Sequence, residues 1–326
     1  MVPALVLTAG LATRLRPLSF VRAKAALPVA GTPLIRRILR SLSSAGVLDV
    51  VLNLHHLPHT LTRLLGDGAE LGMRIRYSWE VPVLGSAGGP KRALPLLSNP
   101  EPRVPSPGSR VPDRGTFLIV NGDTLTDVNL SAVVDDHRRS GALVTMAVVP
   151  NTEPEKYSGV RVTPDGEFAG WVPRAAQEPS YHFIGVQVAE AAAFDSVAAG
   201  IPSEVRTLYS ALIAAQPGSV RAFRTRAEFF DIGTPSDYLN TSLTLATREA
   251  IDTVANAQVS PTARVERSLL WDDVIVEDGA MLRECVVTDG VRVPADTSWH
   301  GVTIRIASDE LASGERRIDG LAIGSL

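Results

Sequence analysis

The sequence has a single cysteine, Cys285, and no uninterrupted apolar run long enough to cross a membrane. One cysteine cannot form a disulfide within the chain, which agrees with a reducing compartment. The apolar residues 1–7 have no positively charged segment before them and are soon followed by Arg14 and Arg16. This pattern predicts neither a signal peptide nor a membrane segment, so we expect a cytoplasmic protein.

The chain also lacks an excess of charge of either sign, and it is poor in lysine. It carries 32 Lys+Arg and 35 Asp+Glu, for a net charge of −3, and only three of the basic residues are lysines. Because there is no overall basic field and no local basic patch is evident, we expect no nucleic-acid partner and no binding to an anionic membrane.

What is present is the length and composition of a globular protein. The 326 residues, 45% of them apolar, predict about two domains at roughly 100–200 residues each. Apolar runs predict strands at 2–8, 47–54 and 73–77, a helix opened by Thr32-Pro33 and stopped at Gly46, and a helix at 60–65. This alternation predicts an α/β protein with a mostly parallel sheet and helices on its faces.

The middle of the chain begins with an interruption. Residues 98–115 are rich in proline and glycine and predict a flexible, exposed insertion. The apolar strand 116–120 then runs into Asn121-Gly122-Asp123, and ligands of open α/β sheets bind beyond the carboxyl ends of such strands. Later patterns predict strands at 142–149, 158–163 and 181–188, a hairpin turn at 165–166, and helices at about 203–215 and 235–248.

After Asn256 the pattern changes to a short apolar repeat. Apolar residues recur five or six positions apart, with Asp-Gly turns between them, at Val259, Val265, Trp271, Val276, Leu282, Val287 and Val293. A parallel β-helix of about two coils accounts for this spacing, and an antiparallel hairpin is the alternative. From Asp296 the repeat is lost, so the tail either caps the coils or has no regular path.

Four charged residues are candidates for a phosphate and metal site. Small residues follow the first strand, where backbone amides can approach an anion, and Arg14 can bind phosphate oxygens through its guanidinium. Lys24 lies between this loop and the first helix, where it either neutralises a phosphate or is simply solvated. Asp123 and Asp231 each follow an apolar segment; they could share one Mg²⁺, a hard cation that prefers oxygen ligands, or serve as turn and cap residues.

The order of these segments resembles that of the sugar-phosphate nucleotidyltransferases, the nucleotide-sugar pyrophosphorylases, over residues 3–245. The family's Gly-Gly-x-Gly-Thr-Arg-Leu-x-Pro loop and its Pro-Lys-Pro-x-Leu-Pro-Val-x-Gly-x-Pro-Leu stretch are matched by Ala9–Pro17 and Ala23–Leu34. The base-contacting Leu-Gly-Thr-Ala-Gly turn is matched by Leu84–Gly88, and the two metal sites by Asn121–Asp123 and Phe230–Pro235.

The resemblance implies a Rossmann-like three-layer domain over residues 1–250, interrupted by the insertion at 98–115. A short left-handed parallel β-helix and tail would follow at 257–326, which in many members serves assembly or regulation, so a homo-oligomer is compatible with it. The implied reaction is attack of a sugar 1-phosphate on the α-phosphorus of a nucleoside triphosphate, giving a nucleotide sugar and pyrophosphate. This chemistry requires mainly positioning and charge neutralisation, so no nucleophilic side chain is needed.

The resemblance also implies a role for each matched residue. Asp123 and Asp231 would hold Mg²⁺, Arg14 would neutralise the triphosphate and the departing pyrophosphate, and Lys24 would engage the phosphates at the reacting centre. The implied nucleotide-binding residues are Ala9, Gly10, Leu11, Ala12, Thr13, Gly85, Ser86, Ala87, Gly88 and Gly122. The implied sugar-binding residues are Gly159, Arg174 and Gly185.

Three departures from the family pattern stand out. Ala9 and Ala12 replace loop glycines, which is tolerated unless the position needs a positive φ. Ala23 and Ala25 replace the prolines on either side of Lys24. The family's sugar-binding Glu-Lys-Pro is absent, because residues 171–174 read Trp-Val-Pro-Arg. Arg174 either supplies the missing positive charge or is a surface arginine.

Several functions remain open on the sequence. The turn at 85–88 favours guanylyl transfer to a hexose 1-phosphate such as mannose 1-phosphate, whereas the text around residues 77–80 and the missing Glu-Lys-Pro favour uridylyl transfer to N-acetylmuramate 1-phosphate. A catalytically silent regulatory subunit of the same fold is a further alternative, but such a subunit is free to lose the four charged residues that this chain keeps. A nucleotide-binding oxidoreductase would need a glycine fingerprint after the first strand, and the loop does not have one.

Overall fold

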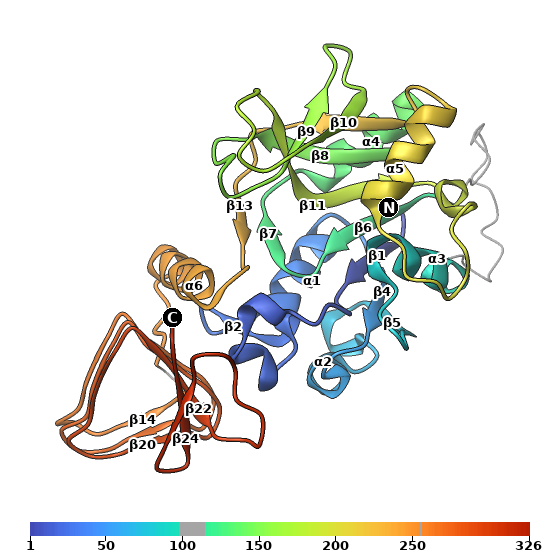
Figure 1. Cartoon of the computed structure of the whole chain (residues 1–326). Coiled ribbons are helices and arrows are strands. Elements are labelled where there is room, and N and C mark those ends of the chain that lie inside the picture. The colour runs from blue at the N-terminus through green and yellow to red at the C-terminus, as the bar shows by residue number, and fades with distance from the viewer. Residues whose placement is uncertain (98–114, 255) are drawn as a thin grey trace. The chain divides into compact units, whose positions relative to one another are not determined.

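The computed structural model describes residues 1–97, 115–254 and 256–326, so most of the predicted insertion at 98–115 lies outside the described residues. Contacts divide the chain into two units. The first comprises Met1–Gly10, Ile38–Pro58 and Thr62–Phe229, and the second comprises Leu11–Arg37, His59–Leu61 and Phe230–Leu326. Figure 1 shows the elements of both, and each unit is described by itself.

The first unit is built on a mixed sheet with the order β10-β9-β11-β6-β1-β4-β5; in addition, β8 pairs with β11, and β12 pairs with β8. Parallel pairing joins β6, β1, β4 and β5, whereas β11 runs antiparallel to β6, β8 and β9. The strands are β1 (Ala4–Leu7), β4 (Asp49–Leu54), β5 (Arg74–Trp79), β6 (Phe117–Asn121), β8 (Val144–Pro150), β9 (Gly159–Val162), β10 (Phe168–Val172), β11 (Tyr181–Ala189) and β12 (Val220–Arg224). The predicted parallel sheet is therefore its core, and antiparallel strands extend it.

Helices cover both faces of this sheet. Residues of α3 (Gly85–Leu97) and α5 (Val205–Ala215) pack in one apolar cluster with Val144, Met146 and Val148 of β8. The side chain of Thr145 points to the opposite face, because neighbouring strand residues alternate, and there it contacts α4 (Leu130–Ser140). The three-layer arrangement follows from these contacts.

A buried histidine joins α4 to the sheet. His137 is 1% exposed; its Nδ1 lies 2.9 Å from Thr145 Oγ1 and its Nε2 lies 3.1 Å from Glu190 Oε1. Burial lowers the pKa of His137 below the ordinary histidine value, and the hydrogen bond that Glu190 accepts from the imidazole offsets only part of that effect. The imidazole is thus held neutral in the folded protein.

This histidine predicts a pH-dependent stability. We expect the free energy of unfolding to fall below about pH 6.5, because the unfolded chain then binds a proton that the folded His137 takes up only at lower pH. The stabilisation is complete above that pH and is lost as the pH decreases, at up to about 1.4 kcal/mol per pH unit for this group. Urea unfolding at neutral and at mildly acidic pH should show a smaller decrease for His137→Gln than for the wild type, and an equal decrease would contradict the assignment.

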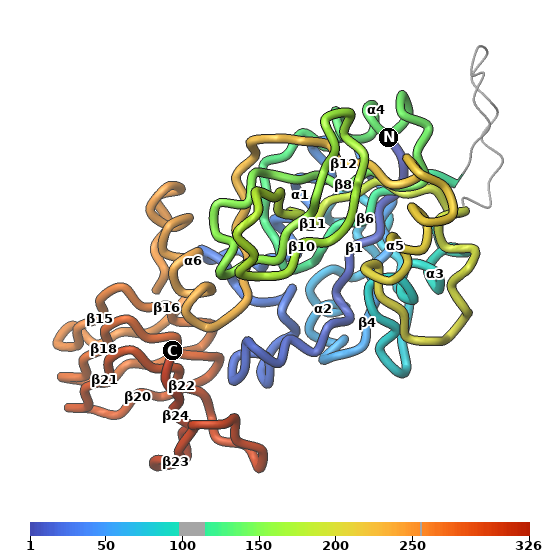
Figure 2. Tube along the Cα trace, turned by 45° about the horizontal axis from the view of Figure 1, so that its top comes forward, coloured from blue at the N-terminus to red at the C-terminus, as the bar shows by residue number. Residues whose placement is uncertain are grey.

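The second unit contains stacked strands whose register advances by one coil of 17 residues. Gln258 pairs with Ile275 and Ile275 with Arg292, and two further sheets repeat this parallel step. The three sheets are β14-β17-β20, β15-β18-β21 and β16-β19-β22, and Figure 2 shows their coils lying one above another. Parallel pairing rules out the antiparallel hairpin for residues 258–304.

The strands of this region are short. They are β14 (Gln258–Val259), β15 (Arg264–Glu266), β16 (Leu269–Leu270), β17 (Ile275–Val276), β18 (Met281–Arg283), β19 (Val286–Val287), β20 (Arg292–Val293), β21 (Ser298–His300) and β22 (Val302–Ile306). Side chains at the same coil position, such as Val259, Val276 and Val293, lie in one apolar cluster. Corners recur with the same step, since Arg267, Glu284 and Gly301 all have positive φ.

The tail after the coils is ordered by antiparallel strands. β24 (Leu321–Ser325) pairs with β22 and with β23 (Arg316–Ile318). A buried ion pair supports this hairpin: Arg305 Nη2 lies 2.7 Å from Glu315 Oε2, and both side chains are at most 2% exposed. The tail therefore caps the coils, one of the two paths that the sequence left open.

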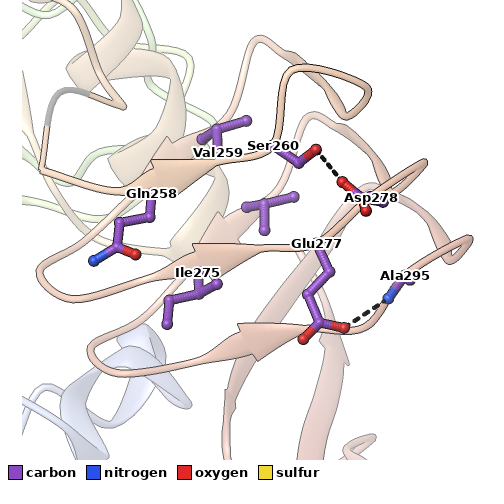
Figure 3. Close-up of a pocket in the computed structure, with 8 residues that line it drawn as sticks. Gln258, Val259, Ser260, Ile275, Glu277, Asp278 and Ala295 are labelled. Atoms are coloured by element: carbon purple, nitrogen blue, oxygen red, sulfur yellow. Dashed lines mark hydrogen bonds between the residues drawn. The ribbon is translucent and has the colours of Figure 1, made fainter.

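A shallow groove lies along the β14-β17-β20 face (Figure 3). Its carboxylates bind neighbouring coils: Glu277 accepts a hydrogen bond from the Ala295 amide at 3.1 Å and from Arg292 at 2.8 Å, and Asp278 accepts one from Ser260. These groups stabilise the stack, and none of the predicted catalytic residues lines the groove.

The remaining elements within the described residues are α1 (Leu34–Ser44), α2 (Pro58–Leu65), α6 (Pro235–Glu249), β2 (Pro28–Val29), β3 (Thr32–Pro33), β7 (Thr124–Thr126), β13 (Phe229–Asp231) and five 3₁₀ turns. The sequence predicts that Thr32-Pro33 opens the first helix, but these residues pair with Pro28-Val29 as a short strand, and the helix begins at Leu34. Within the described residues, no helix is long and apolar enough to cross a membrane.

Candidate active site

The loop after β1 is bent by an alanine in an unusual conformation. Ala12 has φ +47°, in the left-handed region that favours glycine. Its carbonyl accepts hydrogen bonds from the Leu15 amide and the Ser19 hydroxyl, both at 3.0 Å. The loop thus keeps a left-handed turn without glycine, and these hydrogen bonds hold the short 3₁₀ turn Thr13–Leu15 that carries Arg14.

A buried chain of polar side chains connects the end of β1 to the turn at 84–88. The Thr8 amide donates to Asn53 Oδ1 at 2.6 Å, and Asn53 Nδ2 donates to Glu80 Oε1 at 2.8 Å. Glu80 Oε2 then accepts from the Leu84 amide at 2.8 Å, although Glu80 is only 1% exposed. Asn53 and Glu80 are not among the residues predicted from the sequence, where the available signal is an Asn inside the apolar strand 47–54.

We expect Glu80→Gln to lower the free energy of unfolding by about 1–3 kcal/mol, because an amide nitrogen would then face one of two N–H donors. The Michaelis constant for the nucleotide should rise with it, since the turn loses its support. Glu178→Gln is the matched control: Glu178 pairs with Arg161 at 2.7 Å on the surface, so the change in stability should stay below about 1 kcal/mol. Urea unfolding of both variants tests this, and equal losses would remove the role assigned to the buried chain.

The predicted base-binding turn, Gly85–Gly88, forms the first turn of α3. Gly85 has φ +75°, and a Cβ there would lie 2.7 Å from the Ser203 carbonyl oxygen. The amides of Ala87 and Gly88 donate to this same carbonyl, and the Ser86 hydroxyl donates to Glu204. The first amides of the helix are therefore engaged by residues 203–204, and contact of this turn with a base stays a prediction.

Asp123 follows β6 at the edge where the parallel strands end. The preceding Gly122 donates its amide to the Leu7 carbonyl at 2.9 Å, and a Cβ on Gly122 would lie only 2.6 Å from that oxygen. Glycine is thus required for the β6 end to lie against the β1 end. Asp123 Oδ1 accepts a hydrogen bond from Thr124 at 3.2 Å.

Asp231 and Arg14 come together around a glycine in the second unit. The position that a Cβ of Gly233 would take lies 3.2 Å from Asp231 Oδ2, 3.2 Å from Asp237 Oδ2 and 3.7 Å from an Nη atom of Arg14. Asp237 also accepts a hydrogen bond from Thr234, which caps α6 by accepting from the Asp237 amide. Glycine thus leaves a space between two carboxylates and a guanidinium, and Asp237 is a neighbour that the sequence analysis did not identify.

The other predicted residues lie as follows. Lys24 begins a 3₁₀ turn (Lys24–Ala26) and is partly exposed, while the flanking Ala23 and Ala25 are buried. Gly185 has φ +78° in β11, and its side-chain position faces Asn121 and Thr124, next to Asp123.

The two other predicted sugar-binding residues lie at strand ends. Gly159 begins β9, where a Cβ would collide with Ser180, and Arg174 is exposed after β10. Asp123 and Gly185 belong to the first unit, whereas Arg14, Lys24 and Asp231 belong to the second. The shared cation of Asp123 and Asp231 therefore remains a prediction.

An aromatic group lies near the predicted sugar side. The His182 ring of β11 is 4.3 Å from the Tyr157 ring and 5.0 Å from the Phe229 ring, centre to centre. Burial lowers the pKa of His182 below the ordinary histidine value, so a neutral imidazole is favoured there. In the part of the chain that the structure describes, no group of three or more His, Cys, Asp or Glu side chains is arranged to hold a metal ion.

Comparison with known proteins gives consistent matches. A model of the nucleotidyl transferase family matches residues 3–248. The mannose-1-phosphate guanylyltransferase of Mycobacterium tuberculosis is 28% identical over 93% of this chain and 79% of its own length. Mannose-1-phosphate guanylyltransferase 1 of Arabidopsis thaliana is also 28% identical, over 93% of this chain and 82% of its own length.

Solved structures of low identity share the fold. A putative glucose-1-phosphate thymidylyltransferase from Bacillus anthracis superposes with a TM-score of 0.62 at 16% identity, covering 76% of this chain and 95% of that one. HddC from Yersinia pseudotuberculosis, in a complex with GMP-PN, gives 0.60 at 18% identity and covers 75% of this chain and 100% of that one. These likenesses support a mixed α/β fold with a parallel core.

Proposed function

Because the chain belongs to the nucleotidyl transferase family, we propose that it transfers the guanylyl group of GTP to mannose 1-phosphate, forming GDP-mannose and pyrophosphate. Two relatives that match 93% of the chain carry the name mannose-1-phosphate guanylyltransferase. The geometry that supports the proposal best is the space at Gly233, which is bordered by Asp231 and by Arg14. An acidic and a basic group side by side suit a cation and a phosphate chain.

The residues present fit a divalent cation. Asp123 and Asp231 offer carboxylate oxygens, and the missing side chain of Gly233 leaves room beside Asp231. Mg²⁺ is commonly held by one or two carboxylates together with substrate phosphates, so a cluster of three protein ligands is not required. When bound, the cation would neutralise charge on the triphosphate; we propose Mg²⁺ as that cation.

The remaining steps are carried by the chain's own residues. Arg14 binds the triphosphate and neutralises charge on the departing pyrophosphate, and Lys24 binds the phosphates at the reacting centre. In this proposal Ala9–Thr13 and Gly122 also bind the phosphates, because backbone amides beside small residues can approach an anion closely. A phosphate oxygen of mannose 1-phosphate attacks the α-phosphorus of GTP in line. The bond from the α-phosphorus to the oxygen that bridges it to the β-phosphorus breaks, and pyrophosphate leaves.

The sugar side differs from the usual pattern. Arg174 replaces the missing positive charge of the Glu-Lys-Pro motif in this proposal, and the backbone at Gly159 and Gly185 contacts the hexose. The turn Gly85–Gly88 lies against the guanine. The organisation that accompanies these roles is a nucleotidyltransferase domain at 1–250 and a left-handed parallel β-helix with its tail at 257–326, in a cytoplasmic protein that can form a homo-oligomer.

A substrate panel tests the proposed function directly. Purified protein with Mg²⁺ is given each of five nucleoside triphosphates and several sugar 1-phosphates, and pyrophosphate release is followed. GTP with mannose 1-phosphate should give the highest kcat/KM. Preference for UTP with N-acetylmuramate 1-phosphate would replace the proposed substrates, and no release from any pair would support a silent subunit.

A further inference from the structure

Arg22 is held by two aspartates of the stacked coils, within the second unit. Its Nε donates to Asp289 Oδ2 at 2.7 Å, and its Nη2 donates to Asp289 Oδ1 and to Asp272 Oδ2, both at 2.6 Å. The guanidinium carbon also lies 5.3 Å from the centre of the Trp271 ring. The Arg22 side chain is only 18% exposed, so water screens these contacts less than it does at an open surface.

The carboxylates of Asp272 and Asp289 are themselves held by hydrogen bonds. They occupy the same position on successive coils, and the Asp272 amide donates to Asp289 Oδ1 at 3.3 Å. The Gly290 amide donates to the Asp272 carbonyl at 3.0 Å, and Asn256 Nδ2 donates to Asp272 Oδ1 at 2.9 Å. Hydrogen bonds within the coils therefore hold both carboxylates in place beside the Arg22 guanidinium.

A second anchor lies on the other side of Lys24. Trp271 Nε1 donates to the Tyr238 hydroxyl at 2.9 Å, and that hydroxyl donates to the Pro28 carbonyl oxygen. Tyr238 and Trp271 are both at most 2% exposed. Lys24 thus lies between two positions, Arg22 and Pro28, that are tied to the same rigid group.

The need for such anchors arises from the sequence around Lys24. Alanines stand at 23 and 25 where the family pattern has prolines, so the backbone lacks the fixed φ angles that proline gives. Side-chain contacts can replace this stiffness, because a catalytic group must be held close to its productive geometry. Arg22, Asp272 and Asp289 supply that restraint.

We propose that Arg22 is a positioning residue, and that its contacts with Asp272 and Asp289 hold the 22–28 segment so that the Lys24 ammonium meets the reacting phosphates. The stacked coils then support catalysis through Arg22, and the Trp271–Tyr238 contact with Pro28 holds the other end of the segment. The inference rests on the proposed function and extends it to residues outside the motifs that match the family pattern.

The test compares Arg22→Met with Arg267→Met. Arg267 pairs with Glu284 at 3.1 Å, also between successive coils, but it is 62% exposed and lies outside the 22–28 segment. Arg22→Met should lower kcat about 10- to 100-fold with a much smaller change in KM, because a misplaced group weakens the chemical step more than binding. Arg267→Met should keep the wild-type values of both.

Three further variants distinguish a loss of Lys24 positioning from a loss of folding. Asp289→Asn keeps the shape of the acceptor and should lower kcat in the same direction, and the double variant with Arg22→Met should be no slower than Arg22→Met alone. Arg22→Lys keeps the charge but cannot form the same two-sided contact, so it should fall between wild type and Arg22→Met. Thermal unfolding shows that each variant is folded at the assay temperature; should Arg22→Met fail there, Asp289→Asn decides.

The outcomes separate the inference from the proposed function. A wild-type protein with no activity on any substrate pair refutes the proposed function. An active wild type with Arg22→Met and Asp289→Asn as fast as Arg267→Met overturns the positioning role. An increase in KM with unchanged kcat overturns it as well, because it would mean that Arg22 contributes to binding and not to the placement of Lys24.

Discussion

Replacing Asp231 by asparagine is expected to lower kcat by about a thousandfold while the fold stays intact. The amide keeps the size of the carboxylate but cannot supply its negative charge to a divalent cation. Asp231 ends β13, next to the space at Gly233, so the substituted side chain would still fit. Asp123→Asn should cause a loss of similar size if both carboxylates bind one ion. Steady-state pyrophosphate release measures both.

Asp252→Asn is the control for this change. Asp252 is exposed and accepts a hydrogen bond from the Val254 amide at 3.0 Å, so its loss should leave turnover unchanged. Urea unfolding should give similar stabilities for the three variants. Turnover near the wild-type rate in either Asp231→Asn or Asp123→Asn would show that the carboxylate concerned holds no catalytic metal.

The second large effect is expected at Arg14. Arg14→Ala should reduce kcat about 100- to 1,000-fold, because charge that develops on the leaving pyrophosphate would lose its nearest fixed cation. The side chain is exposed and reaches the Gly233 space, so its removal leaves no buried hole. Arg14→Lys should recover part of the rate, since an ammonium keeps the charge but not the two-pronged contact with phosphate.

Arg138→Ala provides the comparison, because Arg138 lies on α4 with 57% of its side chain exposed. Single-turnover rates of the Arg14 and Arg138 variants separate the chemical step from product release. If Arg14→Ala turns over at the rate of Arg138→Ala, the arginine only supports the local 3₁₀ turn.

Elements with a strong local signal were predictable from the sequence. Pro235 predicted the start of α6, and the structure adds the cap, because the Thr234 hydroxyl accepts from the Asp237 amide. Elements that depend on contacts with distant residues were not predictable. The helix α3, for example, begins with Gly-Ser-Ala-Gly-Gly-Pro, a poor helix sequence. This helix is held by acceptors from residues 203–204, which are more than a hundred positions away in the chain.

The C-terminal repeat shows the same limit in another form. Apolar residues five or six positions apart predicted stacked strands, and the parallel pairings confirm that stacking. The full coil of 17 residues is set by corners such as Arg267, Glu284 and Gly301, whose positive φ values have no common residue type. A repeat that depends on backbone corners is therefore only partly visible in the sequence.

Motifs that carry charge name Arg14 and Asp231 as candidate site residues, and the structure brings these two side chains together at Gly233. The supporting residues Asn53, Glu80 and Arg22 could not be predicted, because their roles depend on hydrogen bonds with partners elsewhere in the chain. The apolar strand around Asn53 signals that this residue is buried, but nothing in the sequence names the partners of Asn53 or Glu80. Only the fold brings such side chains to their partners.

Binding of Mn²⁺ in the presence of GTP tests the central claim most directly. Electron paramagnetic resonance titration can count the nucleotide-dependent Mn²⁺ sites in the wild type, in Asp123→Asn, in Asp231→Asn and in the double variant. If the two carboxylates share one cation, each single substitution should remove the same site, and the double variant should lose nothing more. A single variant that keeps the site, or losses that add in the double variant, would contradict a shared cation.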